Sequence, residues 1–291
     1  RKKMKFKLII KITALFSIIS FWSCADPVSE KEIILGCTYI SACNYDETAT
    51  DDDGSCTSKY SEIPANTTIQ AGDSCLADSD IQALADLIEM NNLEEETPLH
   101  LGYQTWMNGR LRFLLAYMNP GQYPAGIETP IDTLPESIGN LTELRILNLQ
   151  WNNIRHLPES FNQLVNLTSL SISNNSLQSI IPDIDSLSQL YTLDLGYNQI
   201  SSIPESISNL SNLTYLYLFN NSLTSLPQGI CNLDLDWSGN DNNWLPFFAI
   251  GGNQLCENIP DCAANSENFE ISLEQFYYSF PIDAPQECDG L

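Results

Sequence analysis

The sequence predicts a solenoid of the α/β type, mostly β-structure, in which short strands alternate with irregular or 3₁₀ return segments. Three observations predict this fold class. A 23-residue unit recurs through the middle of the 291-residue chain, leucines alternate with other residues within each unit, and an asparagine follows at a fixed distance. Eight of the nine cysteines lie in two clusters that flank these units. We therefore expect about five to six repeats between disulfide-bearing caps.

Residues 1–23 predict a secretory signal peptide. Six Lys and Arg residues, from Arg1 to Lys11 inclusive, are interspersed with apolar residues, and the apolar run continues to Trp22. The apolar core from Leu8 is shorter than the roughly 20 residues that span a bilayer. A basic start, a short apolar stretch and small residues after it are typical of an export signal.

The end of this signal resembles a bacterial lipobox, Phe21-Trp22-Ser23-Cys24, with Phe21 where leucine is usual. The resemblance implies lipidation of Cys24 and makes residues 24–36 a tether. Ordinary cleavage after Ala25 is the alternative. We expect an exported lipoprotein of the outer membrane or cell surface, held to the membrane by the lipid anchor only, and otherwise a secreted protein.

The charge balance excludes one class of partner. All 37 acidic residues follow the signal, against six of the 12 basic ones, so the remaining chain carries a net charge of −31. Nucleic acid would be repelled, and we expect no nucleic-acid partner. Such a charge keeps a secreted protein soluble and does not name a partner. We also expect a monomer.

The cysteines indicate disulfides, because eight is an even number in an exported chain. No CxxC motif or Cys/His pair has zinc-ligand spacing, and the C-terminal pairing stays open. The two clusters are Cys37, Cys43, Cys56, Cys75 and Cys231, Cys256, Cys262, Cys288.

Residues 37–60 form a small cysteine-rich module, GCTYISACNYDETATDDDGSC from Gly36 to Cys56. It is similar to a module found in secreted proteins of marine Bacteroidetes. The resemblance implies the pairs Cys37–Cys56 and Cys43–Cys75.

Asp51 and Asp53, which precede Gly54, invite a calcium interpretation. The segment does not fit an EF-hand loop, because Ala49 and Tyr60 occupy the first and twelfth positions, where that loop needs ligating side chains. A structural calcium ion of other geometry near Asp51 and Asp53 is one option, and an Asp/Gly turn is the other. We expect no other cofactor or metal.

Residues 61–110 predict an N-terminal cap. A helix with Ile81, Leu84, Leu87 and Ile88 on one face is expected, with Ser79 or Asp78 as its N-terminal cap.

Residues 111–240 carry the repeats, which fit L-x-x-L-x-L-x-x-N. The four regular copies end at Asn152, Asn175, Asn198 and Asn221, each 23 residues apart. An earlier copy ends at Asn119, and Leu235, Trp237 and Asn240 look like a shortened last copy. This pattern resembles the leucine-rich repeat family, which implies a curved stack with its strands on the concave side.

The physics of the pattern points the same way. Alternating leucines face one side of a strand and are buried only when copies stack, at about 1.5–3 kcal/mol each. The asparagine amide can bond backbone groups in the turn that follows the strand. The returns contain a proline in each copy, which favours irregular or 3₁₀ structure there. Residues 241–291, rich in aromatic residues and cysteine, predict the C-terminal cap.

No enzyme motif is present, and neither His100 nor His156 lies in a catalytic pattern. We therefore expect a non-enzyme that binds a protein or glycan ligand through the concave sheet. The alternative is a structural spacer or adhesin component without a defined ligand. The candidate binding residues are strand residues that face away from the leucines, together with two residues next to them, Trp151 and Tyr197. The strand residues are Tyr117, Asp194, Tyr215, Tyr217 and Phe219. Burial under the caps is the competing interpretation for Tyr117, Tyr215, Tyr217 and Phe219.

Overall fold

The computed structural model describes residues 33–94, 97–118, 127–275, 278 and 280–288. The signal segment, Cys24, most of the tether and Asn119 of the first repeat lie outside the described residues. All described secondary structure lies in the compact unit Ile34–Leu291. Within the described ranges, no helix is long and apolar enough to cross a membrane.

The cysteine module consists of short strands held by two disulfides. Cys37 pairs with Cys56 and Cys43 with Cys75, which confirms the pairing implied by the resemblance. Strand β1 (Leu35–Gly36) pairs in parallel with β2 (Asp51–Asp52). Strand β3 (Thr57–Lys59) pairs antiparallel with β5 (Cys75–Ala77).

The N-terminal cap is built around the predicted helix, α1 (Asp78–Asn91), which buries Leu84 and Leu87. The helix starts at Asp78 without a side-chain cap, so the prediction that Ser79 or Asp78 would cap it is wrong. Asp80 is fully buried and forms an ion pair of 2.8 Å with Arg110, which ties α1 to the first repeat strand. The remaining elements of this cap are β4 (Thr67–Ala71), η1 (Pro98–His100) and β6 (Tyr103–Met107).

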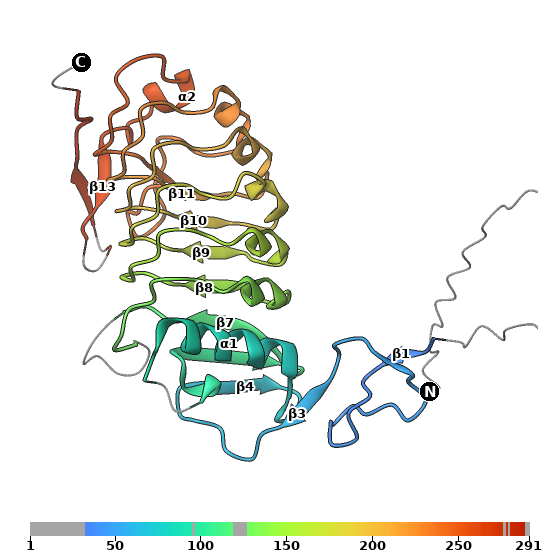
Figure 1. Cartoon of the computed structure of the whole chain (residues 1–291). Coiled ribbons are helices and arrows are strands. Elements are labelled where there is room, and N and C mark those ends of the chain that lie inside the picture. Colours follow the sequence, from blue (N-terminus) through green and yellow to red (C-terminus); the bar gives the residue numbers. More distant parts are fainter. Residues whose placement is uncertain (1–32, 95–96, 119–126, 276–277, 279, 289–291) are drawn as a thin grey trace, which may run out of the picture. The chain divides into compact units, whose positions relative to one another are not determined.

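One eight-stranded sheet runs through both the cap and the repeats, in the order β12-β11-β10-β9-β8-β7-β6-β4 (Figure 1). Strands β7 to β12 are parallel and in register, whereas β6 runs antiparallel to β7. The repeat strands are β7 (Arg110–Leu115), β8 (Ile146–Asn148), β9 (Ser169–Ser171), β10 (Thr192–Asp194), β11 (Tyr215–Tyr217) and β12 (Phe248–Ala249).

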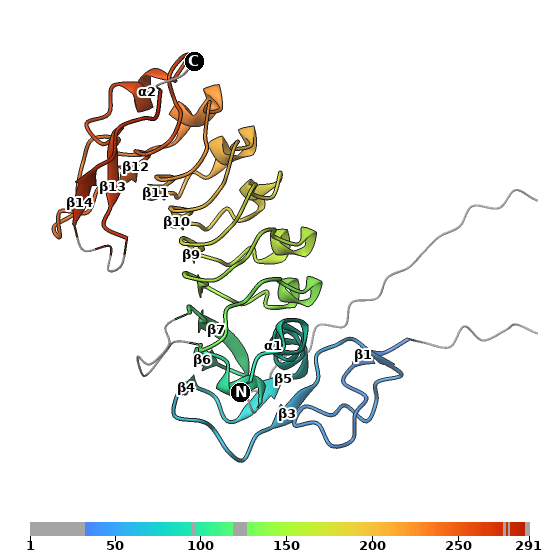
Figure 2. The same cartoon turned by 60° about the vertical axis from the view of Figure 1, so that its left-hand side comes forward.

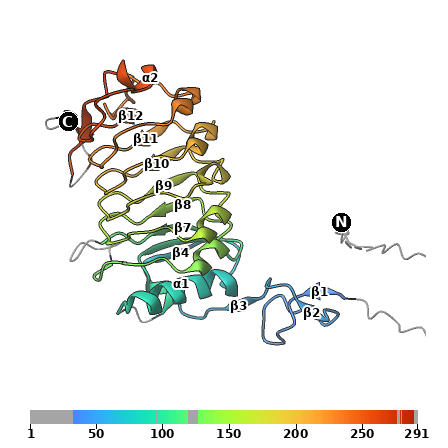
Figure 3. The same ribbon diagram turned by 45° about the horizontal axis from the view of Figure 1, so that its top comes forward.

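The return segments are 3₁₀ turns on the side opposite the strands (Figure 3), as the prolines predict. Proline precedes four of them directly, where its fixed φ suits the start of a helical turn. They are η2 (Glu136–Asn140), η3 (Glu159–Gln163), η4 (Ile184–Ser186), η5 (Glu205–Asn209) and η6 (Gln228–Asn232).

The leucine column is aligned and fully buried, which confirms the predicted solenoid. Its middle row pairs strand to strand and consists of Leu114, Leu147, Leu170, Leu193 and Leu216. No copy alone could bury these side chains, so the stack is stabilised mainly along this column.

The asparagine column crosslinks neighbouring copies. Asn198 donates to the carbonyls of Ile172 (2.9 Å) and Leu195 (3.1 Å), and its side-chain oxygen accepts from the Leu177 amide (2.9 Å). Asn152, Asn175 and Asn221 make the equivalent bonds. Each amide therefore satisfies backbone groups of two copies.

The last repeat is not where the sequence predicted it. The strand that pairs with β11 is β12, and Asn253 holds the final asparagine position by bonding the Leu218 and Ile250 carbonyls. The predicted copy at Leu235, Trp237 and Asn240 is therefore wrong. The real frame is Leu245-x-x-Phe248-x-Ile250-x-x-Asn253, so Asn253 lies 32 residues after Asn221 and the repeat is nine residues longer than 23.

The C-terminal cap contains the short helix α2 (Asp261–Ala264) and the antiparallel hairpin of β13 (Ile271–Leu273) and β14 (Pro281–Asp283). Disulfides Cys231–Cys262 and Cys256–Cys288 hold this cap to the end of the stack. Figure 2 shows β13 and β14 on the strand side, beside β12 and β11. Two residues of the predicted aromatic tail, Phe276 and Tyr277, lie outside the described residues.

Candidate binding surface

The side chains that point away from the leucine column form one surface, which we call the strand face. On β7, β8 and β9 the side chains of this face are half-buried, and no element among the described residues covers them. We call this part the open half. It consists of Phe113, Leu115, Tyr117, Ile146, Asn148, Gln150, Ser169 and Ser171. The residues on β10 and β11 are mostly buried.

The C-terminal hairpin covers the far part of the strand face. Tyr217 (7% exposed) and Phe219 (0%) pack with Leu273 of β13. The Tyr217 hydroxyl donates to the Pro246 carbonyl (2.9 Å), and that of Tyr197 donates to the Leu273 carbonyl (2.9 Å). Capping is therefore the interpretation that the geometry favours for Tyr217 and Phe219.

Gly196 makes this covering possible. A β-carbon at this position would lie 2.3 Å from the Phe219 ring, so any other residue would displace that ring. Phe219 in turn lies 5.7 Å from the Tyr278 ring, centroid to centroid. The small residue in β10 thus forms the recess that the capping aromatics fill.

Asp194 lies at the boundary between the open and covered parts and is 3% exposed. Its carboxylate accepts from Ser173 Oγ (2.9 Å), Gln150 Nε2 (3.1 Å) and the Gly196 amide (3.1 Å). Burial raises the pKa of Asp194 to about 6, and these three neutral donors only partly offset that effect. A ligand cannot reach this carboxylate in the present arrangement, so Asp194 acts as an organiser of the neighbouring polar side chains.

Those polar side chains continue into the open half as a ladder. Gln150 donates to Ser173 Oγ (2.8 Å), and Asn148 Nδ2 donates to Gln150 Oε1 (3.0 Å). Because each member is fixed by its neighbour, the open half presents oriented amide and hydroxyl groups beside the apolar Phe113 and Ile146.

A column of left-handed residues follows the strands: Trp151 (φ 59°), Asn174 (φ 55°), Tyr197 (φ 52°) and Asn220 (φ 51°). Asn tolerates this conformation, but large aromatic residues adopt it at a cost of about 1–2 kcal/mol. Trp151 is half-buried beside the open half. The repeat thus holds an aromatic ring where the backbone would favour Asn or Gly.

A second group of aromatic residues lies at the start of β10 and β11, and sequence reasoning found only Tyr215 of it. Tyr191 is 49% exposed, and its ring centroid lies 5.6 Å from that of Tyr215. The Tyr215 hydroxyl donates to Asp241 Oδ2 (3.2 Å), and burial raises the pKa of Tyr215 to about 12. Trp244 in the same loop as Asp241 is 78% exposed. The correct frame of the last repeat would have indicated this loop, because it reveals the nine-residue insertion.

A cavity of about 300 Å³ lies among the returns of two neighbouring repeats and includes His156, Glu159 and Asp183 in its lining. The sequence assigned His156 no role. In this return the proline, Pro182, lies one position later in the 23-residue frame than Pro158 and Pro204 do in the neighbouring copies.

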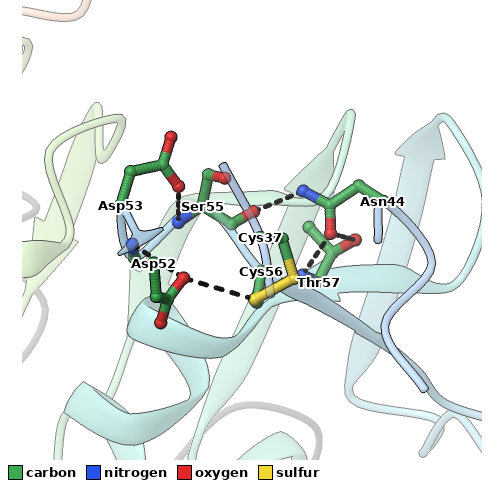
Figure 4. Close-up of a disulfide and its surroundings, with 8 residues drawn as sticks. Cys37, Asn44, Asp52, Asp53, Ser55, Cys56 and Thr57 are labelled. Carbon is green, nitrogen blue, oxygen red and sulfur yellow. Dashed lines mark hydrogen bonds between the residues drawn. A yellow bond between two sulfur atoms is a disulfide. The ribbon is translucent and has the colours of Figure 1, made fainter. Parts of the chain in front are cut away.

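The predicted calcium region is a hydrogen-bonded turn (Figure 4). The Gly54 and Ser55 amides donate to the carboxylates of Asp52 (3.2 Å) and Asp53 (3.0 Å), beside the Cys37–Cys56 disulfide. The hydrogen bonds from Ser55 lower the pKa of Asp53. No group of three or more metal-ligating side chains occurs among the described residues. Calcium near Asp51 and Asp53 stays a prediction.

Comparisons with known proteins identify the repeats. Residues 165–223 match a family model described as leucine rich repeat, and residues 143–164 match a second model of the same description. Leucine-rich repeat proteins are generally non-catalytic protein-interaction modules. No curated protein sequence matches the chain.

The chain is also similar to solved structures. A plant ice-binding protein is 22% identical with a TM-score of 0.50, over 66% of this chain and 61% of its own. At this identity the likeness shows the fold alone. A leucine-rich repeat protein of Leptospira interrogans is 27% identical (TM-score 0.38, 55% of this chain, 46% of its own). The BIR3–SERK2 complex from Arabidopsis thaliana matches at 24% (TM-score 0.39, 53% and 74%).

Proposed function

We propose that this leucine-rich repeat chain is a non-catalytic binding protein that recognises a protein ligand at the cell surface through the open half of the strand face. The observation that carries the proposal is the contrast between the two halves. The hairpin β13–β14 packs on Tyr217 and Phe219, whereas no element among the described residues covers the half-buried Phe113, Leu115 and Ile146 in this way.

The chemistry of the open half fits a protein surface. Apolar side chains lie on β7 and at the start of β8, and oriented amides and hydroxyls follow on β8 and β9, so the surface combines the apolar and polar groups that protein interfaces use. The parallel strands hold these groups rigidly, so little conformational entropy is lost when a ligand binds. Tyr117 and Trp151, at the ends of β7 and β8, would supply the aromatic anchors.

The four disulfides indicate an oxidising environment, as expected of an extracellular or secreted protein. The lipobox-like sequence before Cys24 supports attachment to a membrane through a lipid. Together they support a position at the cell surface.

The test is capture of a ligand by the immobilised chain from envelope or host extracts. Ser169→Arg and Trp151→Ala should each reduce capture at least tenfold, with the melting temperature within about 2 °C of wild type. Val165→Arg is the matched control, because Val165 is 46% exposed in the return segment after η3. Equal capture by all three variants would contradict the proposal. Capture of a polysaccharide instead would assign a glycan ligand, and no capture would favour a structural spacer.

A further inference from the structure

An aromatic–acid cluster lies at the start of β10 and β11, and we define it as Tyr191, Tyr215, Asp241 and Trp244. Tyr215 is its centre, with ring centroids 5.6 Å from Tyr191 and 5.1 Å from Phe247. The hairpin β13–β14 packs with Tyr197, Tyr217 and Phe219, which lie later in the same two repeats, and Tyr215 also packs against that group. Two rings of the cluster are consequently open to solvent, Tyr191 at 49% and Trp244 at 78%.

The insertion in the last repeat builds one side of this cluster. Asp241 Oδ1 accepts from the amides of Asn243 (2.8 Å) and Leu245 (3.0 Å), which closes a tight loop around Trp244. Trp244 adopts φ 66° in this loop, in the left-handed region that disfavours large side chains. An exposed tryptophan in a strained backbone contributes no packing, so its presence needs another reason.

The hydrogen-bonding capacity of the cluster restricts what it can bind. Tyr215 uses its only donor on Asp241 Oδ2 (3.2 Å), so its oxygen is left as an acceptor. A carboxylate has acceptors only, and hydrogen bonds from Leu245, Asn243 and Tyr215 outweigh desolvation and lower the pKa of Asp241. The Tyr215–Asp241 pair thus offers acceptors and a negative charge, and the exposed Tyr191 and Trp244 add the faces of aromatic rings with one donor each, a hydroxyl and an indole N–H.

The complement of such a site is a planar cation that donates hydrogen bonds. Arginine has five N–H donors and no acceptor, pairs with carboxylates and stacks on aromatic rings. Lysine is a compact, strongly hydrated charge and gains less from the ring faces. A neutral sugar lacks the positive charge that pairs with Asp241. The net charge of −25 favours approach of a cation.

We propose that the aromatic–acid cluster binds an arginine side chain, held by Asp241 and stacked on the rings of Tyr191 and Trp244. The inference relies on the proposed function only in assigning the arginine to a protein ligand. It concerns other residues than the open half, so either proposal can fail while the other stands.

The experiment is an NMR titration of the full chain with N-acetyl-arginine amide, following the indole N–H signal of Trp244. Trp244→Phe identifies that signal. The neutral isostere N-acetyl-citrulline amide and methyl β-glucoside are the comparison probes. We expect saturable shifts with the arginine probe, in the millimolar range, and at least tenfold weaker binding of both comparison probes.

Variants test the named residues. Asp241→Asn should weaken binding of the arginine probe at least tenfold, whereas Asp234→Asn, at an exposed carboxylate in the same repeat but outside the cluster, should leave it unchanged. Because Asp241 also organises its loop, Tyr191→Ala is the second test, and it should weaken binding at least threefold. Equal binding of the citrulline probe, tighter binding of the glucoside, or unaltered binding in both Asp241→Asn and Tyr191→Ala would overturn the proposal.

Discussion

Replacing Asp194 by Asn should stabilise the protein at neutral pH and leave it nearly unchanged in acid. The carboxyl is fully buried with three neutral donors, and its pKa is about 6 against an ordinary value of 3.8. At 1.36 kcal/mol for each factor of ten in proton affinity, this difference corresponds to about 3 kcal/mol. The folded state binds the proton more tightly than the unfolded state does. The stabilising effect of protonation is therefore complete below about pH 4 and is lost as the pH rises through 6.

Asn has nearly the same shape as Asp and no charge, so the variant does not lose the stability that wild type loses when Asp194 ionises. Its oxygen can accept from the Gly196 amide, and its amide can donate to Ser173 Oγ and to a rotated Gln150. We expect the free energy of unfolding of Asp194→Asn to exceed that of wild type by about 2–3 kcal/mol at pH 7.5 and by less than about 1 kcal/mol at pH 4. Denaturant titrations between pH 4 and 8 measure the difference. A difference that is independent of pH, or that shrinks as the pH rises, would refute the reasoning.

Three further predictions concern the column, the loop and the cap. Asn198→Ala leaves the buried Leu177 amide without its acceptor, while the Ile172 and Leu195 carbonyls keep the bonds from Asn175 and Asn221. It should therefore cost about 1–3 kcal/mol in denaturant titrations, whereas the exposed Asn209→Ala should cost under about 0.5 kcal/mol; similar losses would contradict the crosslinking role. Trp244→Gly removes the backbone strain of a tryptophan at φ 66°, so the free energy of unfolding should rise by about 0.5–1 kcal/mol while arginine binding weakens. A lower free energy of unfolding would show that the Trp244 ring contributes packing. Replacing Cys231 and Cys262 together by Ser removes a disulfide that closes a loop of 31 residues and should lower the free energy of unfolding by about 3–4 kcal/mol. If the variant unfolds at the same denaturant concentration as wild type in oxidising buffer, the bond is not formed.

The repeat architecture could be predicted because its signal is local and recurs. Each leucine and asparagine has the same neighbours in the next copy, so the spacing of 23 residues fixes which side chains are stacked. The N-terminal disulfides followed from a resemblance of the module. The end of the stack was predicted wrongly because Leu235, Trp237 and Asn240 match part of the repeat pattern. The true last copy, which ends at Asn253, follows an insertion and therefore lies outside the 23-residue spacing.

The covered part of the strand face could not be predicted in this way. Whether Tyr217 is a binding anchor or a capped residue depends on β13, more than 50 residues later in the chain, and no periodic pattern links the two. Gly196 was the available signal, since a missing side chain in a strand marks the close approach of another group. The exposed Tyr191 and Trp244 were missed because neither belongs to the alternating strand positions.

Hydroxyl-radical footprinting of the chain with its captured protein ligand tests the central claim most directly. The account predicts that labelling of Phe113, Leu115, Ile146 and Trp151 falls at least threefold in the complex, while Val165 on the return side is labelled as in the free chain. Protection of Val165 with unchanged labelling of the four open-half residues would contradict it.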